Sequence, residues 1–307
     1  MARFLTSLGG PCRELRASRG VLAYRSAAMS RPFLKMNGLG NDFVVVEARS
    51  APFAPSAEEV RAIADRASGI GCDQLIVIEP PLAGETGEGV DARVRFWNAD
   101  GEEISACGNG TRCVGWLLMQ ASGQDRAVIE TRAGLLIATR AGERLVSVDM
   151  GRPGLDWTEI PLSEAHDTAT LDVRLYDHPS LSTAPACVSM GNPHVVFFVD
   201  DLDAAPIRQA GPAIERHPLF PDGVNVGFAQ VLDRDRVRLR VWERGAGLTQ
   251  ACGTGACAAL VAAARRGLTD RTATLVLDGG ELLIEWRDDD HVVMTGPAAV
   301  DFAGELP

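Results

Sequence analysis

The chain contains the same sequence pattern twice, and this duplication restricts the possible folds more than any other feature. The segment 95–98 (RFWN) aligns with 240–243 (RVWE), and 106–110 (ACGNG) aligns with 251–255 (ACGTG), without a gap at an offset of 145 residues. Each copy begins as an alternating strand, crosses a glycine-containing loop and enters a helix-forming run. A duplicated sequence of this kind predicts a duplicated structure.

The duplication extends upstream of these segments. Asn41 is followed by an apolar run and lies 33 residues before Gln74, and Asn192 is followed by another and lies 33 residues before Asn225. The next interval is longer in the first half, which places an insertion in the acidic, Gly-rich stretch 80–91. Each half therefore offers, in order, an asparagine, a second amide, an Asn or Glu, and Cys-Gly-x-Gly.

A helix is predicted between the two amides of each half. The first covers residues 56–67, where Ser56 and Glu59 have the spacing of a capping box, and the second covers about 204–216. Helical runs also follow the Cys-Gly-x-Gly motifs, at 113–119 and 256–264. Strand patterns are more frequent, at 75–78, 128–131, 145–150, 237–242, 272–277, 282–286 and 292–295.

These patterns predict an α+β fold of two similar domains from an internal duplication. Each domain is expected to be a curved, mixed or antiparallel sheet packed around a central helix. The N-terminal half comprises residues 31–150 together with 298–307, and the C-terminal half comprises 151–297. Because pockets favour domain interfaces, the active site is predicted in the cleft between the halves.

Residues 1–30 differ in composition from the rest of the chain. They contain five arginines and one acid. An Arg-rich, Ser-containing, acid-poor segment is typical of an organelle transit peptide. The alternative is an extension produced by an upstream start codon, with Met29 as the real start. Under either interpretation this N-terminal leader is expected to be poorly ordered and to have no catalytic function.

Composition excludes several classes of protein. Lys35 is the single lysine, and pyridoxal phosphate enzymes anchor their cofactor on a lysine, a role that arginine cannot take. No Gly-Lys pair occurs, so a Walker-type phosphate loop is absent. The net charge of −11 argues against nucleic acid as the main partner. No apolar run approaches the ~18 residues of a membrane span.

Both Cys-Gly-x-Gly motifs stand at the start of a predicted helix, where backbone amides can bind an anion. The first amides of a helix have no internal partner and carry the positive end of the helix dipole. Two such starts facing each other would form a receptor for a carboxylate. The same field stabilises a thiolate by up to ~2 kcal/mol, which at ~1.36 kcal/mol per unit lowers a cysteine pKa by about one and a half units. From an ordinary value of ~8.5, this predicts a pKa of about 7 for Cys107 and Cys252.

Two such cysteines on opposite sides of one carboxylate predict inversion of a stereocentre without a cofactor. One thiolate removes the proton alpha to the carboxylate, and the opposing thiol delivers a proton to the other face. The amide hydrogen bonds strengthen as negative charge moves onto the carboxylate oxygens. The two cysteines need different protonation states and titrate as a coupled pair.

Other interpretations of the cysteines remain open at this point. A Cys-Gly-x-Gly cysteine can be a buried structural residue. The segment 253–258 formally fits a dinucleotide-binding pattern, although strand–helix alternation around it is poor. The cysteine spacings do not fit a zinc knuckle, so no metal is expected. An oxidised Cys107–Cys252 disulfide is possible, as an inactivating side reaction. The remaining cysteines after the leader read as core residues: Cys72, Cys113, Cys187 and Cys257.

Three charged or titratable residues stand beside the duplicated motifs. His194 ends the segment Gly-Asn-Pro-His next to Asn192. Glu243 aligns with Asn98, so one half has a charge where the other has an amide, and this asymmetry is expected to affect which cysteine holds the proton. Arg244 can bind a carboxylate bidentately; the alternative for Arg244 is an ordinary surface charge.

Taken together, the motifs resemble the diaminopimelate epimerase family over about residues 31–300. The resemblance implies interconversion of LL- and meso-2,6-diaminopimelate, without pyridoxal phosphate or metal, by a cytoplasmic homodimer on the pathway to lysine and peptidoglycan precursor. The motifs that carry it are KMNGLGNDF (35–43), GCDQ (71–74), NADG (98–101), ACGNG (106–110), GNPH (191–194), NVG (225–227), ERGAG (243–247) and ACGTG (251–255).

The resemblance assigns a role to each matching residue. Cys107 and Cys252 correspond to the acid–base pair, and His194 and Glu243 to residues that tune the cysteine pKa values. The backbone cradle for the reacting carboxylate corresponds to Gly108, Asn109, Gly253 and Thr254, and the other substrate contacts to Asn41, Gln74, Asn98, Asn192, Asn225, Glu243 and Arg244. Two positions depart from many relatives: Leu248 replaces an acid, and Cys72 replaces an aromatic residue.

Two alternatives to this function are kept. Proline racemase or hydroxyproline epimerase resembles the same two-cysteine design, although Cys-Gly-Asn-Gly in the first half and the Arg244 anchor favour diaminopimelate. A module that binds an amino acid without reacting would also have two lobes and an anion cradle. Exchange of solvent deuterium into the substrate distinguishes an enzyme from such a module.

Overall fold

The structure is a computed structural model that describes residues 31–82 and 89–306. The N-terminal leader predicted at 1–30 lies outside the described residues, as does the central part of the insertion predicted at 80–91. Within the described ranges, no helix is long and apolar enough to cross a membrane.

The described residues of the first half, 31–82 and 89–150, form eight strands and two helices. In order they are β1 (Arg31–Gly38), β2 (Asn41–Glu47), α1 (Ala57–Ala64), β3 (Gln74–Glu79), β4 (Ala92–Asn98), β5 (Glu103–Ile104), α2 (Gly108–Ser122), β6 (Arg126–Thr131), β7 (Gly134–Arg140) and β8 (Leu145–Asp149).

The second half repeats this order, element for element, and the chain then ends in one further strand. After a short 3-10 helix, η1 (Pro179–Leu181), the elements are β9 (Ala186–Ser189), β10 (Pro193–Phe198), α3 (Ile207–Glu215), β11 (Asn225–Asp233), β12 (Arg236–Glu243), β13 (Gly247–Leu248), α4 (Gly253–Arg265), β14 (Thr272–Leu277), β15 (Gly280–Trp286), β16 (Val292–Pro297) and β17 (Ala299–Leu306).

Strand pairing is duplicated as well. β2 and β3 run parallel, as do β10 and β11; β4 and β6 run parallel, as do β12 and β14; most other neighbours are antiparallel. The register places equivalent residues alike, since Phe43 pairs with Gln74 and His194 with Asn225. The predicted α+β fold with an internal duplication is therefore confirmed.

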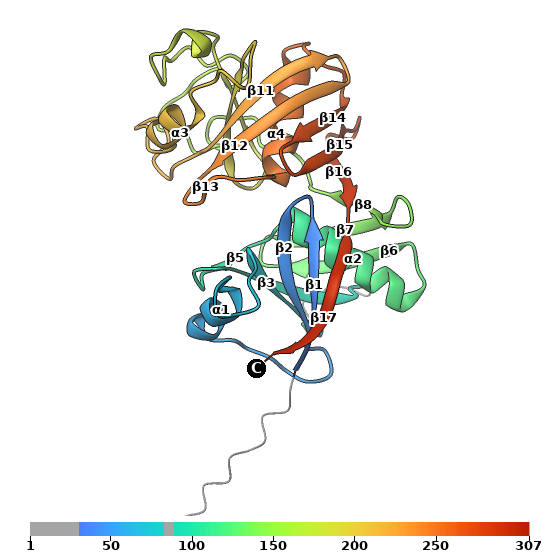
Figure 1. Cartoon of the computed structure of the whole chain (residues 1–307). Helices are drawn as coiled ribbons and strands as arrows, with labels where there is room; N and C mark the ends of the chain where they lie inside the picture. The colour runs from blue at the N-terminus through green and yellow to red at the C-terminus, as the bar shows by residue number, and fades with distance from the viewer. Residues whose placement is uncertain (1–30, 83–88, 307) are drawn as a thin grey trace, which may run out of the picture. The chain divides into compact units, whose positions relative to one another are not determined.

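Each half packs its strands around one central helix (Figure 1). Val114 and Met119 of α2 are fully buried in a core shared with Ile76 and Phe96. In α4, ten of the thirteen residues are buried, from Gly253 to Ala263. A helix that is apolar on every side must be enclosed, and the alanines of α4 allow the surrounding strands to approach it closely. Cys107 and Cys252 stand at the N-termini of these enclosed helices.

The two halves share backbone and side-chain contacts. β8 of the first half pairs antiparallel with β16 of the second, so one continuous sheet connects them. Leu39, in the turn between β1 and β2, has a positive φ of 60° and is buried in the hydrophobic core around α4. An L-residue in this conformation is strained, and burial of its side chain opposes the strain.

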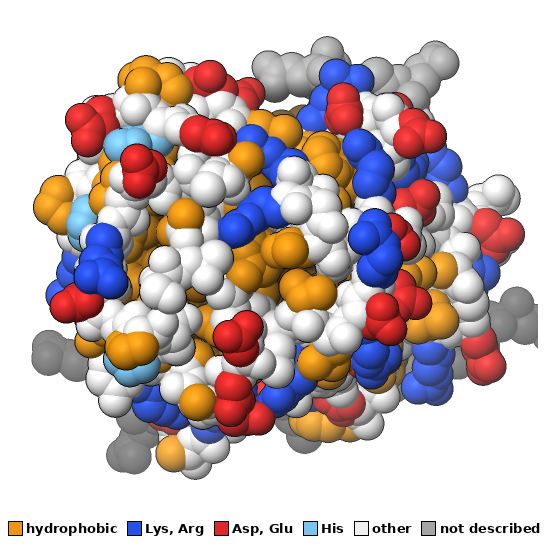
Figure 2. All heavy atoms as spheres, turned by 90° about the horizontal axis from the view of Figure 1, so that it is seen from above, with side chains coloured by type: hydrophobic (Ala, Val, Ile, Leu, Met, Phe, Trp, Pro, Cys, Tyr) orange, Lys and Arg blue, Asp and Glu red, His pale blue; other side chains and the backbone are white. Residues whose placement is uncertain are grey.

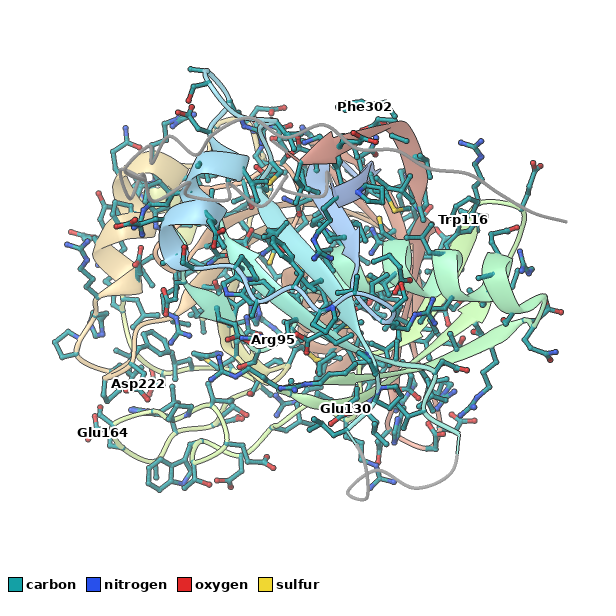
Figure 3. All side chains as sticks on the ribbon, turned by 90° about the horizontal axis from the view of Figure 1, so that it is seen from below. Arg95, Trp116, Glu130, Glu164, Asp222 and Phe302 are labelled. Carbon is teal, nitrogen blue, oxygen red and sulfur yellow. The ribbon has the colours of Figure 1, made fainter. Side chains whose placement is uncertain are left out.

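The last strand returns to the first half. β17 pairs antiparallel with β1, and its Phe302 is half exposed (Figure 3) and meets Phe33 edge to face. We propose that the two halves meet between residues 150 and 151 and that residues 298–307 belong to the first half. The β1–β17 pairing supports the second assignment.

The predicted strands and helices agree with the structure apart from their ends. Helix α1 begins at Ala57 with the predicted capping box of Ser56 and Glu59, but ends at Ala64 rather than at residue 67. The Asp65 carboxylate accepts a hydrogen bond from the Ala67 amide and so forms a turn that competes with the helix. Helix α3 begins at Ile207, three residues later than predicted, because Pro206 disfavours helical backbone before it.

Candidate active site

Cys107 and Cys252 cap their helices in the same way. Each is the N-cap residue, with φ and ψ of −140° and 115° for Cys107 and of −127° and 109° for Cys252. The amide of Gly110 donates to Cys107 Sγ at 3.4 Å, and the amide of Gly255 donates to Cys252 Sγ at 3.4 Å. A sulfur held at an N-cap lies at the positive end of the helix dipole.

The two helix starts lie against each other. A Cβ built on Gly253, at the first turn of α4, would come within 3.3 Å of Asn109 Oδ1, at the first turn of α2. Met294 of β16 packs on both starts, since a Cβ on Gly108 or on Gly253 would meet its side chain at 2.8 Å or 2.9 Å. Unpaired amides from two helices are thus brought to one place, which is suited to an anion.

Substitution of Gly255 tests how closely the Cys252 thiol must be placed. In Gly255→Ala the new methyl group would lie 2.8 Å from Val241 Cγ2 and 3.2 Å from Cys252 Sγ, so the thiol or the helix must shift. We expect catalytic efficiency to fall by about 100-fold, since displacements of about 1 Å have that effect. The control is Gly142→Ala, where the nearest atom lies at an ordinary 3.4 Å. Equal activity of the two variants in a steady-state assay would contradict this placement.

Cys252 is a hydrogen-bond donor to Glu243. Its Sγ lies 3.1 Å from Glu243 Oε2, and the other carboxylate oxygen accepts a hydrogen bond from the Thr249 hydroxyl. Burial raises the pKa of the Glu243 carboxyl, although the hydrogen bonds from Thr249 and Cys252 oppose this. Burial, followed by the charge of Glu243, raises the pKa of Cys252 well above its ordinary value. In this structure Cys252 therefore holds its proton.

Cys107 has no carboxylate partner of this kind. Burial, together with the charge of Glu243, raises its pKa to about 11, while the Gly110 amide and, more weakly, the guanidinium of Arg112 act in the opposite direction. The sequence-based expectation of a pKa of about 7 for both cysteines is therefore wrong for this structure. The difference comes from desolvation, which raises the pKa of a nearly enclosed thiol by more than the helix dipole lowers it.

His194 belongs to a small polar cluster beside Cys252. Its Nε2 lies 3.1 Å from both Asn192 Oδ1 and Thr254 Oγ1, and the Thr254 hydroxyl lies 3.6 Å from Cys252 Sγ. Burial, and then the charge of Arg244, lowers the pKa of His194 to about 3. The neutral His194 imidazole does not contact the Cys252 thiol directly. It is connected to that thiol through the Thr254 hydroxyl.

The amides of the first half are organised in pairs. Asn109 donates to Asn41 Oδ1 at 2.7 Å, and Gln74 donates to Asn98 Oδ1 at 3.0 Å. Gln74 Oε1 is buried without a hydrogen-bond partner. A buried acceptor of this kind is costly unless a ligand satisfies it, so the structure brings these four predicted contacts together and leaves one of them free to bind.

The second half places Asn225 beside Arg244. Asn225 donates to the carbonyl of Pro193 at 3.0 Å and accepts from the Arg244 amide at 2.9 Å. The Arg244 guanidinium is exposed and donates to the Asp222 carbonyl at 2.6 Å. Its remaining donors are open to solvent and to a ligand carboxylate.

A cavity of about 540 Å³ opens beside these residues. The first half contributes Asn41 and its neighbour Asp42, and the second half contributes Leu248 and Thr249. Asn41 is itself a predicted site residue, whereas Thr249 is the hydrogen-bond partner of one, Glu243.

Sequence reasoning missed a network of charged side chains that supports Asn41. Lys35 is buried, donates to the Gly71 carbonyl and lies 2.6 Å from Asp42 Oδ2. Asp42 accepts from the Asp73 amide at 3.0 Å, and Asp73 in turn accepts from Asn41 at 3.1 Å. Although partial burial opposes it, hydrogen bonds from Arg66 and Lys35 hold the pKa of Asp42 well below its usual range. The single lysine therefore has a structural role.

Removal of this lysine is expected to destabilise the fold. In Lys35→Met the free energy of unfolding should fall by about 2 kcal/mol at pH 7, because Asp42 keeps Arg66 but both Asp42 and the buried Gly71 carbonyl lose a charged hydrogen-bond donor. Because the folded-state pKa of Asp42 is depressed, this contribution is present above the unfolded pKa of about 4 and is lost as the pH falls towards the folded value.

Denaturant unfolding of Lys35→Met at pH 7 and at pH 3 measures this contribution. The matched control is Arg49→Met, which breaks the exposed pair with Glu47 and should cost less than about 1 kcal/mol. An effect of Lys35→Met no larger than that of Arg49→Met would contradict the structural role.

The other cysteines are enclosed in apolar surroundings. Cys113, Cys187 and Cys257 are fully buried, and burial raises the pKa of each thiol to about 12. Cys72 is buried beside α1, and Leu248, the second departure from many relatives, packs against the core around α3. All six cysteines that the structure describes are free thiols. Within the same residues, no group of three or more His, Cys, Asp or Glu side chains is placed to hold a metal ion.

Comparison with known proteins relates this arrangement to one family. A family model described as diaminopimelate epimerase matches residues 33–155 and 186–300. The chain is 75% identical over 282 residues to the diaminopimelate epimerase of Phenylobacterium zucineum, a match that covers 92% of this chain and 100% of the relative. It is 59% identical over 292 residues to that of Caulobacter vibrioides, covering 91% and 98%.

Solved structures share the fold at much lower sequence identity. A hydroxyproline epimerase from Agrobacterium vitis aligns with a TM-score of 0.64 and 16% identity, covering 91% of this chain and 93% of its own. A predicted epimerase from Pseudomonas aeruginosa aligns with a TM-score of 0.64 and 19% identity, covering 90% and 99%. The fold is therefore wider than the family. The close relatives and the family match over both halves are specific, and they show that the chain belongs to the diaminopimelate epimerase family.

Proposed function

We propose that this protein interconverts LL- and meso-2,6-diaminopimelate without a cofactor, through Cys107 and Cys252 as the acid–base pair. The observation that carries the proposal is the equivalent placement of the two thiols. Each caps the start of an enclosed helix, and the two helix starts lie against each other. The identity of the close relatives supports diaminopimelate as the substrate.

The proposed reaction moves one proton off the substrate and one onto it. The thiolate of one cysteine takes the proton from the carbon alpha to the bound carboxylate, and the C–H electron pair delocalises into that carboxylate. The thiol of the other cysteine then protonates the opposite face of the carbon. The stereocentre is inverted, and the two sulfurs have exchanged protonation states.

The helix starts are proposed to stabilise the charged intermediate. Amides at Gly108 and Asn109, and at Gly253 and Thr254, have no partner within their helices. They lie where negative charge would develop on the carboxylate oxygens, and fixed donors of this type contribute about 10²- to 10³-fold in rate.

The two cysteines differ in their surroundings, and we propose that this difference tunes them. Cys252 donates to Glu243 and reaches His194 through Thr254, whereas Cys107 has neither neighbour. Glu243 can accept the Cys252 proton directly. His194, whose pKa is lowered by burial, stays neutral at physiological pH and can act as a hydrogen-bond partner for Thr254.

The remaining polar residues are proposed to bind the two zwitterionic ends of the substrate. The amides are Asn41, Gln74, Asn98, Asn192 and Asn225, and the charged groups are Glu243 and Arg244. Gln74 has an unsatisfied buried oxygen and Arg244 has donors open to solvent, so both can take a hydrogen bond from or to the substrate.

We also propose a cytoplasmic homodimer, for which the family resemblance is the support. The face of the molecule in Figure 2 carries acidic and basic side chains side by side, without the basic field expected of a nucleic-acid-binding surface.

The proposed homodimer is tested by light scattering after gel filtration, which should give twice the chain mass of 32.7 kDa.

An assay with diaminopimelate and two prolines tests the proposed function. Purified protein should convert LL-diaminopimelate to the meso form, seen by chiral chromatography, and should leave L-proline and trans-4-hydroxy-L-proline unchanged. Inversion of a proline in place of diaminopimelate would favour the second candidate, a proline-type racemase, which the structural likeness to a hydroxyproline epimerase keeps in view. Binding of diaminopimelate without inversion would indicate a binding module.

A further inference from the structure

Arg112 is a fully buried arginine in the first turns of α2, five residues after Cys107. It has no acidic partner among the residues that the structure describes. Its Nη1 donates to Asn109 Oδ1 at 2.9 Å, its Nε donates to the Pro297 carbonyl at 3.3 Å, and its Nη2 is buried without any partner. Burial lowers the pKa of the Arg112 guanidinium. Arginine nevertheless stays protonated in proteins, so the site contains an unpaired positive charge.

The contacts of Arg112 join the two halves at the helix starts. Asn109 belongs to α2, whereas Pro297 and Met294, whose sulfur lies 3.4 Å from Arg112 Nη1, belong to β16. A Cβ on Gly296 would lie 3.1 Å from the Arg112 Nε, so the strand backbone passes directly over the guanidinium. The side chain therefore fixes the first turn of α2 against the strand that also packs on α4.

Arg112 also breaks the duplication. The equivalent residue of α4, at the same offset of 145, is Cys257. Cys257 is fully buried, and the Arg112 charge acts to lower the pKa of its thiol, as it does for Cys107 and Cys113. The two equivalent positions are thus close enough for the Arg112 charge to act on the Cys257 thiol. One half supplies a buried cation and the other supplies Glu243, the carboxylate bound to Cys252.

We propose that Arg112 is a positioning residue for this site. It holds the Asn109 side chain between the two helix starts, and it supplies the buried positive charge for the anion formed there. That anion is, resting on the proposed function, the substrate carboxylate during turnover, and it is the Cys107 thiolate whenever that thiol has given up its proton. An unpaired buried charge is unfavourable in the folded protein, and an anion between the helix starts would compensate it.

The consequence is a division of charge between the two thiols. Arg112 acts to lower the pKa of Cys107, whereas Glu243 raises the pKa of both thiols and is hydrogen-bonded to Cys252. The two charges therefore make Cys107 the more readily deprotonated thiol of the pair, even though the two helix starts have the same backbone geometry.

The Cys107 titration tests this role without any turnover. The rate of alkylation by iodoacetamide is followed against pH for the Cys107 peptide by mass spectrometry, in the wild type and in Arg112→Met, Arg112→Gln and Arg112→Lys. We expect the apparent pKa of Cys107 to rise by about one unit in the Met and Gln variants and to return towards the wild-type value in Arg112→Lys. Epimerase activity of the Met and Gln variants should fall by about 100-fold.

The matched control is Arg265→Met, on the equivalent helix. Arg265 is partly buried and donates to the Cys187 carbonyl and to Thr168, away from the helix start. Its replacement should leave the Cys107 titration unchanged. An Arg112→Gln protein that is folded by circular dichroism and titrates like the wild type would overturn the proposal, as would an equal shift in Arg265→Met. If Cys107 shifts as expected but the wild type does not epimerise diaminopimelate, the proposed function fails and the role of Arg112 in tuning Cys107 stands.

Discussion

Cys107→Ala and Cys252→Ala should each lower the kcat for epimerisation by about 10³- to 10⁴-fold in both directions. Each thiol is the proton donor in one direction and, as thiolate, the proton acceptor in the other, and a positioned acid or base contributes about 10²- to 10⁴-fold. Because both roles are needed within one turnover, the double variant should be scarcely worse than either single variant. Steady-state rates starting from LL- and from meso-diaminopimelate measure this loss.

The matched control for these variants is Cys187→Ala. Cys187 is a free thiol, fully buried in the core around α3 and β10, so this variant loses a similar volume without touching the helix starts. It should retain activity and lose at most a few kcal/mol of stability. A variant of either capping cysteine with near wild-type activity, in a protein of normal thermal stability, would contradict the assignment.

Glu243→Gln should shift the pH–rate profile unequally in the two reaction directions. The carboxylate raises the pKa of Cys252, to which it is hydrogen-bonded, so its loss should move the Cys252 titration to lower pH by about one unit. In the direction where Cys252 is the base, the rising limb of the profile moves to lower pH. In the direction where it is the acid, the falling limb moves instead.

The same variant should also lose activity overall. A hydrogen bond to a charged group contributes about 1.5 to 3 kcal/mol, which corresponds to roughly 10- to 100-fold in kcat/KM. The control is Glu79→Gln, a partly buried carboxylate of β3 that pairs with Arg93 and Arg95. Equal and negligible shifts of both profiles in Glu243→Gln would mean that the carboxylate does not set the protonation state of Cys252.

The sequence was sufficient to predict the duplicated fold, because the signal is a long-range repetition rather than a local propensity. The offset of 145 residues relates α2 to α4 and β4 to β12, and the capping cysteines stand where helix-start chemistry predicts them. Element ends were less predictable. The side-chain turn at Asp65 and the restriction before Pro206 shortened two helices that the apolar pattern alone would extend.

Two features of the site could not be predicted from the sequence. The thiol pKa values depend on desolvation, which is known only once the strands enclose the helix starts, so the dipole argument gave the wrong value. The role of Arg112 was equally hidden, since a single arginine near a helix start usually lies on the surface. Its position opposite Cys257 in the duplicated frame was the available signal, because a core position cannot carry a charge without a specific reason.

The placement of two thiols at opposed helix starts is tested most directly by isotope exchange at early conversion. LL-diaminopimelate is incubated with the wild-type protein in D₂O, and the two diastereomers are separated and analysed by mass spectrometry before a tenth of the substrate has reacted. A thiol on the far face, exchanged with solvent, delivers deuterium to the product, while substrate that returns regains its own proton from the near face. We therefore predict meso product that carries deuterium and recovered LL substrate that carries almost none. Product that keeps the original hydrogen, or deuterium distributed equally between the two diastereomers, would show a single base and contradict the two-thiol site.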